Sequence, residues 1–191
     1  EGTLRNHDHR ATGPRGTEAR EIDDSLTSSL LIAGIAVFVL LLLVFRSVRY
    51  ALITIIPVIL VACWLYGFMY IAGYSLNMLT ATIAAISIGV GIDYSIHFTE
   101  RFREELGKWG DKREAIRITA GTTGLALFSA ALTTAVGFAV IALAPMPIFS
   151  TFGILTAIMI TLSVLMALFA LPSLLYGFIP QDKKPQKQDQ V

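Results

Sequence analysis

Uncharged and mostly apolar residues fill three long blocks of the chain, and short charged segments separate these blocks. The blocks cover residues 25–45, 50–92 and 118–181. About 20 apolar residues in a helix cross the ~30 Å hydrocarbon core of a bilayer, so the first block predicts one transmembrane helix and each of the others predicts two. The pattern therefore predicts an all-α membrane protein with five spans, at about residues 25–45, 50–71, 76–98, 118–143 and 148–179.

Turn-forming residues indicate where the two longer blocks divide. Gly73 and Ser75 predict a turn after the second span, and Tyr70 and Tyr74 beside it suit the aromatic belt at a membrane surface. Residues 144–147, Ala-Pro-Met-Pro, predict the turn between the fourth and fifth spans. Pro57 lies within the second span, and membrane helices tolerate such a proline.

The charged segment between the third and fourth spans has helical periodicity. Apolar side chains recur at helical spacing beside charged ones, which predicts a short cytoplasmic amphipathic helix on the membrane surface at about residues 99–109. Gly107 and Gly110 interrupt this pattern. Asp111, followed by Glu114, predicts a capping box that begins the next helix.

The two ends of the chain are polar. Residues 1–24 are rich in Arg, Asp and Glu and predict a water-exposed stub, the end of a preceding soluble domain. Residues 181–191 are rich in Gln and Lys and predict a disordered cytoplasmic tail. The chain starts without Met and without a signal peptide, so we expect it to be the C-terminal piece of a longer polypeptide.

The placement of Lys and Arg predicts the orientation in the membrane. Basic residues occur in the turn at 46–49, in the segment 101–117 and in the tail, which all fall on one side of the five spans. The two opposite loops have none, and the positive-inside rule makes the basic side cytoplasmic. We therefore expect a multi-pass protein of the plasma (inner) membrane with its N-terminus outside and its C-terminus in the cytoplasm.

The composition agrees with a membrane protein. Hydrophobic residues make up 54% of the chain and charged residues 15%, whereas charged residues average about 25% in soluble domains. The net charge of +1 gives no reason to expect a nucleic-acid partner. The single cysteine, Cys63, cannot form an intrachain disulfide and is expected to serve packing.

Asp93 is the one Asp, Glu, Lys or Arg residue inside a predicted span, the third at about residues 76–98. Placing a carboxylate in hydrocarbon costs at least ~2.5 kcal/mol on insertion scales, so an intramembrane Asp is a candidate functional residue. Burial disfavours the charged form of a carboxyl group. We therefore expect Asp93 to bind and release a proton.

Small side chains lead to this carboxyl group along one face of the predicted helix. Residues spaced by four form one inclined row, and this row consists of Ala81, Ala85, Gly89, Asp93 and His97. Small residues allow another helix to approach closely, which predicts that Asp93 lies at a helix–helix contact. The fourth span offers the hydroxyl groups of Ser129, Thr133 and Thr134, which can hydrogen-bond a carboxylate or hold water.

Most of these residues also have a purely structural interpretation. Tyr94 points about 100° away from Asp93 and suits ordinary packing, and His97 lies where a histidine meets lipid headgroups. Small hydroxyl residues commonly pack membrane helices. Gly89 and Gly91 fit close packing better than a ligand site, because there is no Walker pattern. The sequence has no metal-ligand cluster and no nucleophile–base pair, so we expect no enzyme and no cofactor, with protons as the coupling ion.

The motif Gly89-x-x-x-Asp93-Tyr94 resembles the GxxxDY signature of the resistance-nodulation-division (RND) superfamily, in particular its MMPL and sterol-sensing-domain-like exporters. Residues 129–138, SAALTTAVGF, look like the next helix of that family, and residues 12–14, Thr-Gly-Pro, resemble the end of its porter domain. The resemblance covers essentially the whole chain. It implies a protein of two similar membrane halves, of which this chain supplies the last five spans.

The resemblance implies efflux by proton antiport, with lipids or other hydrophobic compounds as substrate and Asp93 and Tyr94 as the proton relay. Gly89 belongs to the motif, and the spacing along the predicted helices adds His97, Ser129, Thr133 and Thr134 as residues that would support the relay or its packing. The implied partners are membrane lipids, a hydrophobic substrate and a missing N-terminal half, and a homo-oligomer is compatible with this arrangement. Two alternatives stay open: a sterol-sensing-like regulatory module that binds lipid, and an accessory of the SecD/SecF type for protein translocation.

Overall fold

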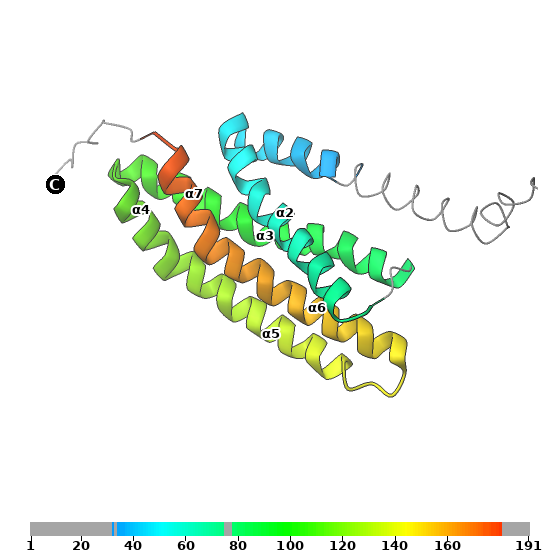
Figure 1. The fold of residues 1–191 in the computed structure, drawn as a ribbon. Coiled ribbons are helices and arrows are strands. Elements are labelled where there is room, and N and C mark those ends of the chain that lie inside the picture. Colours follow the sequence, from blue (N-terminus) through cyan, green and yellow to red (C-terminus); the bar gives the residue numbers. More distant parts are fainter. Residues whose placement is uncertain (1–31, 33, 75–77, 181–191) are drawn as a thin grey trace, which may run out of the picture.

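The computed structural model describes residues 32, 34–74 and 78–180, and these residues form helices and turns without a strand. The helices are Gly34–Phe45, α2 at Val48–Ile71, α3 at Met78–Trp109, α4 at Lys112–Thr119, α5 at Leu125–Ile141, α6 at Pro147–Leu165 and α7 at Leu171–Phe178 (Figure 1). Two short π-helical segments, η1 at Ala120–Gly124 and η2 at Met166–Ala170, join α4 to α5 and α6 to α7.

Three of the described helices are long and apolar enough to cross a membrane. They are α2, the continuous helix Lys112–Ile141 and the continuous helix Pro147–Phe178, which correspond to the predicted second, fourth and fifth spans. The shorter apolar helix Gly34–Phe45 falls within the predicted first span, and the predicted third span falls within α3. The protein is an all-α membrane protein, as the hydrophobic pattern predicts.

The breaks between helices fall where the sequence predicts turns. Gly73 follows α2 with a φ of 72°, and Gly110 ends α3 with a φ of 69°, a conformation that glycine adopts without steric cost. The carboxylate of Asp111 accepts a hydrogen bond from the backbone N–H of Arg113 at 3.1 Å and caps α4. Pro147 is the first residue of α6, a position where a missing N–H does no harm.

One predicted boundary differs from the structure. Residues 99–109 are helical, as expected, but they continue α3 without a break, so that α3 has 32 residues. The separate short amphipathic helix is α4, which follows Gly110. The physical reason is that Gly107 lies inside a helix that ion pairs stabilise on both sides of it, whereas Gly110 adopts the positive φ that stops a helix.

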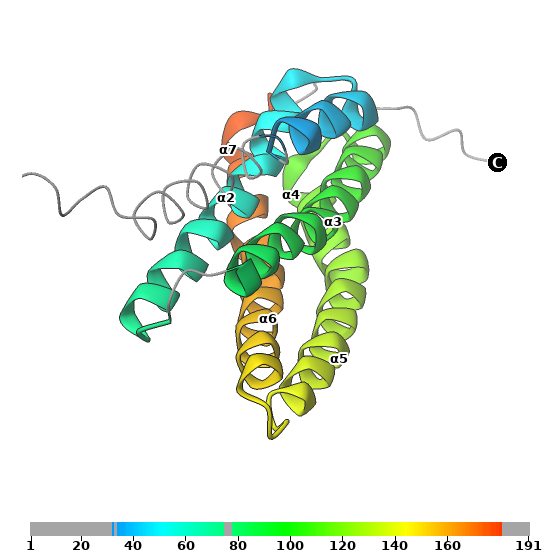
Figure 2. The same ribbon diagram turned by 90° about the vertical axis from the view of Figure 1, so that its right-hand side faces the viewer.

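Helix α6 is the element on which the others pack. It contacts α2, α3 and α5, and its buried residues lie along most of its length. Helix α5 packs along α6 with Ala131 buried and Leu127, Ala135 and Phe138 partly buried, and its opposite face is exposed. Figure 2 shows α5 and α6 side by side, joined by their loop at the lower end, while the turn before α2 and the end of α3 lie at the upper end.

The two π-helical segments meet at α3. A Cβ atom added to Gly124 of η1 would lie 3.1 Å from Leu168 of η2 and 3.8 Å from Phe98 of α3. Phe98 is fully buried there. This meeting point lies one helical turn beyond Tyr94, a residue of the predicted relay. π-Helical turns within α-helices are often found at functional sites. The predicted stub at 1–24 and tail at 181–191 fall outside the described residues.

Candidate functional site

The row of small residues and Asp93 lies on the side of α3 that the other described helices leave open. Ala85, Gly89, Asp93 and His97 are all exposed, and a Cβ atom added to Gly89 would meet nothing within 4 Å. The side chain of Ala81 is not among those described. The structure therefore confirms that the four described positions share one face, and it leaves the carboxyl group of Asp93 without a covering helix in this part of the protein.

Tyr94 points the other way. Its side chain is 8% exposed and belongs to a hydrophobic cluster with residues of α2 and α6, among them Leu65 and Met159. Successive residues of a helix differ by about 100° in direction. As a result, Asp93 places its carboxyl group on the open face of α3, and Tyr94 places its phenol inside the bundle.

Helix α6 fixes the position of α3 directly behind Asp93. A Cβ atom added to Gly91 would lie 3.0 Å from the hydroxyl oxygen of Ser163 on α6, and Ser163 is itself buried. Gly91 is therefore the glycine of close helix approach, whereas Gly89 lies on the open face. The sequence analysis does not predict a role for Ser163. The signal that could have indicated this residue is its small side chain, which suits close packing against a glycine such as Gly91.

A second buried contact holds α3 against α2. The hydroxyl groups of Thr54 and Thr99 form a hydrogen bond of 3.0 Å, and both side chains are fully buried. The bond lies six residues beyond Asp93 along α3. Together with the Gly91–Ser163 contact, it fixes how far α3 is rotated and therefore which face Asp93 occupies.

The hydroxyl groups of α5 do not meet Asp93 in this structure. Each bonds to a backbone carbonyl of its own helix: Ser129 to Ala126 at 2.9 Å, Thr133 to Ser129 at 3.0 Å and Thr134 to Ala130 at 2.9 Å. All three side chains are exposed. The reason is that α6 packs against both α3 and α5, and buried or lipid-facing Ser and Thr side chains commonly bond back to the preceding turn. In the described residues, no hydrogen bond joins these hydroxyl groups to Asp93.

The end of α3 beyond the site carries a network of ion pairs. Glu104 accepts hydrogen bonds from Lys108 at 2.6 Å and from Arg101 at 2.8 Å, and these two cations hold the pKa of Glu104 below its usual value. The carboxylate of Glu105 is nearly buried and contacts Arg101 at 2.9 Å, Lys108 at 3.1 Å and the indole N–H of Trp109 at 3.1 Å. Arg101 lies about 12 Å of helix rise from Asp93, so this network is separate from the site.

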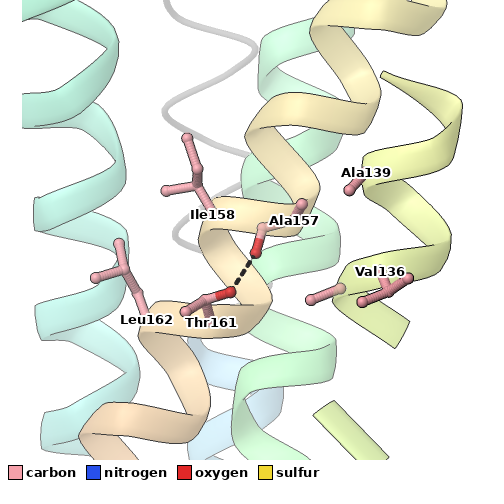
Figure 3. Close-up of a pocket in the computed structure, with 7 residues that line it drawn as sticks. Val136, Ala139, Ala157, Ile158, Thr161 and Leu162 are labelled. Atoms are coloured by element: carbon pink, nitrogen blue, oxygen red, sulfur yellow. Dashed lines mark hydrogen bonds between the residues drawn. The ribbon is translucent and has the colours of Figure 1, made fainter. Parts of the chain in front are cut away.

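An apolar groove of about 390 Å³ lies between α5 and α6. The residues that line it are Ala135, Val136, Ala139, Ala157, Ile158, Thr161 and Leu162. Figure 3 shows that the Thr161 hydroxyl donates to the carbonyl of Ala157, at 2.8 Å. The one hydroxyl group of the lining is thus already bonded, and the groove offers a surface suited to hydrocarbon.

Comparisons with known proteins agree on one family. A model of the MMPL family matches residues 10–188. The protein MJ1562 of Methanocaldococcus jannaschii, whose name says only that it is a membrane protein, is 32% identical over 158 residues, which are 83% of this chain and 40% of that protein. The chain thus spans less than half of the length of this relative.

Two relatives have names that state what they transport. The mycolic acid-containing lipids exporter MmpL11 of Mycolicibacterium smegmatis is 33% identical over 100 residues, which are 51% of this chain and 10% of the exporter. The hopanoid transporter HpnN of Rhodopseudomonas palustris is 38% identical over 64 residues, 34% of this chain and 7% of the transporter. Both are much longer than the chain described here.

Proposed function

The chain belongs to the MMPL family, and from this premise we propose that it is the C-terminal part of a proton-motive-force-driven exporter of lipids or other hydrophobic compounds, with Asp93 and Tyr94 as the proton relay. The family and its lipid-transporting relatives make the chain a membrane segment related to lipid transporters. The direction of transport, the coupling to protons and the substrate class of this protein are the proposal.

The observation that carries the proposal is that the carboxyl group of Asp93 lies on the open face of α3. The row of small residues on this face allows another helix to approach closely. Asp93 lies between Gly89 and His97 on that face. A carboxylate that faced lipid would cost several kcal/mol, so a partner must cover it in the assembled protein. The relatives are longer than the chain, and we propose that a further membrane half of the same protein, or a second copy of this one, supplies the covering helix.

The proposed coupling follows from the contacts behind the carboxyl group. Protonation of Asp93 removes a charge from the contact and favours a closer approach of the covering helix, because the neutral acid is cheaper to desolvate. Tyr94 supplies a hydroxyl group on the inner side of the same helix turn. Since α3 packs on α6 at Gly91 and Ser163, movement of α3 would pass to α6 first, rather than to α5, whose hydroxyl groups the sequence offers to Asp93.

The proposal includes a location and an orientation. We place the protein in the plasma (inner) membrane, with its C-terminus and the charged end of α3 in the cytoplasm. The support is the placement of basic residues at one end of the helices, at Arg46, Arg49 and beyond Arg101. The apolar groove between α5 and α6 would face lipid tails in this arrangement.

Export of a fluorescent lipid or hydrophobic dye by the full-length protein in inverted membrane vesicles tests the proposal. We expect transport that an uncoupler abolishes, that Asp93→Asn eliminates and that Tyr94→Phe reduces, because Phe keeps the packing and removes the hydroxyl group. Asp111→Asn is the matched control, since Asp111 caps α4 outside the membrane. Transport by Asp93→Asn at the wild-type rate would refute the relay, and the absence of any lipid transport by the intact protein would favour a regulatory or translocation-accessory role.

A further inference from the structure

The turn after the helix Gly34–Phe45 and the start of α2 carry guanidinium groups that no carboxylate of the described residues neutralises. Arg46 is exposed in the turn and has a positive φ of 49°, and Arg49 is exposed in the first turn of α2. No Asp or Glu occurs between residues 25 and 92. Within the described residues, no carboxylate lies within 4 Å of either arginine.

A third guanidinium group reaches the same turn from α3. The group of Arg103 lies 4.8 Å from the ring centre of Tyr50 and 5.6 Å from that of Phe45, and the two rings are 6.3 Å apart. Phe45 and Tyr50 flank the two exposed arginines in sequence. Arg103 therefore lies against the two aromatic residues that flank Arg46 and Arg49 in sequence, and aromatic faces hold it instead of an acid.

The other basic residues at this end of the helices are mostly engaged. Arg101 and Lys108 pair with Glu104 and Glu105, and Arg117 pairs with Glu114 at 3.0 Å. Lys112 donates to the carbonyl of Tyr176 at 3.1 Å. Glu100 is exposed on the neighbouring face of α3, and the described structure gives it no ion pair with Arg103. Within the described residues, Arg46 and Arg49 are two exposed guanidinium groups close in sequence without an ion pair, whereas Arg113 on α4 is a single one.

We propose that Arg46, Arg49 and Arg103 form a binding surface for the headgroup of an anionic phospholipid. The turn joins two apolar helices, which places it at the depth of the headgroups. A guanidinium group that lies on aromatic rings keeps its N–H edge free to bind phosphate oxygens in a bidentate manner. The net positive charge selects a headgroup with a net negative charge over a zwitterionic one. The lipid would hold the end of α3, ten residues beyond Asp93, in the headgroup layer.

The test is the association of spin-labelled phosphatidylglycerol, relative to spin-labelled phosphatidylcholine, with the full-length protein in phosphatidylcholine vesicles. We expect the wild type to prefer phosphatidylglycerol. Arg46→Gln and Arg49→Gln should each weaken this preference about fivefold, and both positions are exposed, so the fold should be retained. Arg103→Gln should do the same, while Arg103→Lys should keep part of the preference.

Arg117→Gln is the charge-matched control, because it removes one positive charge at the same end of the helices from a group that is already paired. We expect this variant to behave like the wild type. An equal preference for the two lipids in the wild type, or an equal effect of Arg117→Gln and Arg49→Gln, would overturn the proposal. Loss of the preference in inorganic phosphate, but not in chloride of equal ionic strength, would assign the surface to a soluble anion and would also overturn it.

Discussion

At position 93 the helix turns a carboxyl group to its open face, and at position 94 it turns a phenol to the inside of the bundle. The 3.6-residue period of the helix makes this division unavoidable for neighbours in sequence. A relay built from such a pair needs one side of α3 to meet a covering helix and the other to pack on α2 and α6. Gly91 and Ser163 set that packing, because Gly91 has no side chain and the small side chain of Ser163 lies against it.

The first prediction concerns this contact. Gly91→Ala places a methyl group 3.0 Å from the Ser163 hydroxyl oxygen, so α3 or the serine must shift, and we expect reduced transport by the full-length protein. Combining it with Ser163→Ala removes the opposing oxygen and should restore most of the activity, a positive coupling in a double-mutant cycle. Gly89→Ala, which meets nothing within 4 Å in the described structure, shows what a methyl group on the open face does. Wild-type transport by Gly91→Ala alone would contradict the positioning role.

At the scale of helices, the α5–α6 pair and the long α3 determine where the site lies. Helix α6 packs on both α3 and α5, so α5 is the outer helix and its hydroxyl groups bond to their own backbone. The π-helical segments η1 and η2 meet beside Phe98. The part of α3 that carries Asp93 is therefore held by α2 and α6, and its charged end is held by ion pairs.

The second prediction tests the closeness of α5 and α6. A Cβ atom at Gly153 would lie 2.5 Å from the backbone nitrogen of Ala142 and 2.6 Å from the carbonyl oxygen of Phe138, and a backbone cannot move aside as a side chain can. Gly153→Ala should therefore lower the free energy of unfolding by at least about 1–3 kcal/mol. Gly137→Ala on α5 meets nothing within 4 Å and should be neutral or stabilise by up to about 1 kcal/mol. Thermal unfolding in detergent measures both, and equal melting temperatures would show that the helices are not in close contact.

The third prediction concerns pH and the end of α3. Hydrogen bonds from Lys108 and Arg101 lower the pKa of Glu104 from its ordinary 4.5, so the ion pairs stabilise the fold above pH 4.5 and this stabilisation is lost as pH falls through the lowered pKa. The pKa of Lys108 is raised from 10.5 by Glu104 and Glu105, so its share is present below pH 10.5 and is lost as pH rises through the raised value. Because Glu104 is exposed, the effect is small.

Glu104→Gln gives the measurement. Its melting temperature should lie slightly below that of the wild type at pH 7, and the two should converge as the pH falls through the lowered pKa, where the wild-type carboxylate becomes protonated. Glu100→Gln removes a carboxylate from the same stretch of α3 without removing an ion pair of the described structure, and it should show no such convergence. A difference between Glu104→Gln and wild type that is constant from pH 3 to pH 7 would count against the ion pair.

The sequence predicts the local features of these helices well and their neighbours poorly. Gly73, Gly110 and Asp111 end or begin helices because φ and capping depend on adjacent residues, and the sequence contains that information. Which helix lies behind Asp93 depends on contacts between distant segments. The hydroxyl groups of α5 suit a carboxylate chemically, yet the helix that packs on α3 behind Asp93 is α6, where Ser163 lies against Gly91.

At the scale of the whole molecule, the chain is an all-α membrane segment that spans 40% or less of the relatives described above. The open face of α3 and the open surface of α5 are consistent with a protein in which further membrane helices pack against this segment. The substrate and its path would then depend largely on regions beyond this chain. What this segment contributes in our account is one carboxyl group, its phenol neighbour and the helices that hold them.

The fourth prediction is the orientation. The full-length protein is first freed of its own cysteines, Cys63 among them, and one cysteine is then introduced. In place of Met146 this cysteine lies in the loop between α5 and α6, and in place of Gly107 it lies near the end of α3. Both positions are exposed. An impermeant thiol reagent added to intact cells should label the first and not the second. The reverse pattern would invert the orientation that the basic residues indicate.

The fifth prediction tests the central claim, and it is a measurement of proton movement. The full-length protein is reconstituted into vesicles that contain a pH-sensitive dye, and a gradient of transported lipid or hydrophobic compound is imposed. The wild type and Asp111→Asn should move protons in response to the gradient. Asp93→Asn should move none while keeping the same fold and the same amount of inserted protein. Proton flux through Asp93→Asn at the wild-type rate would contradict the account.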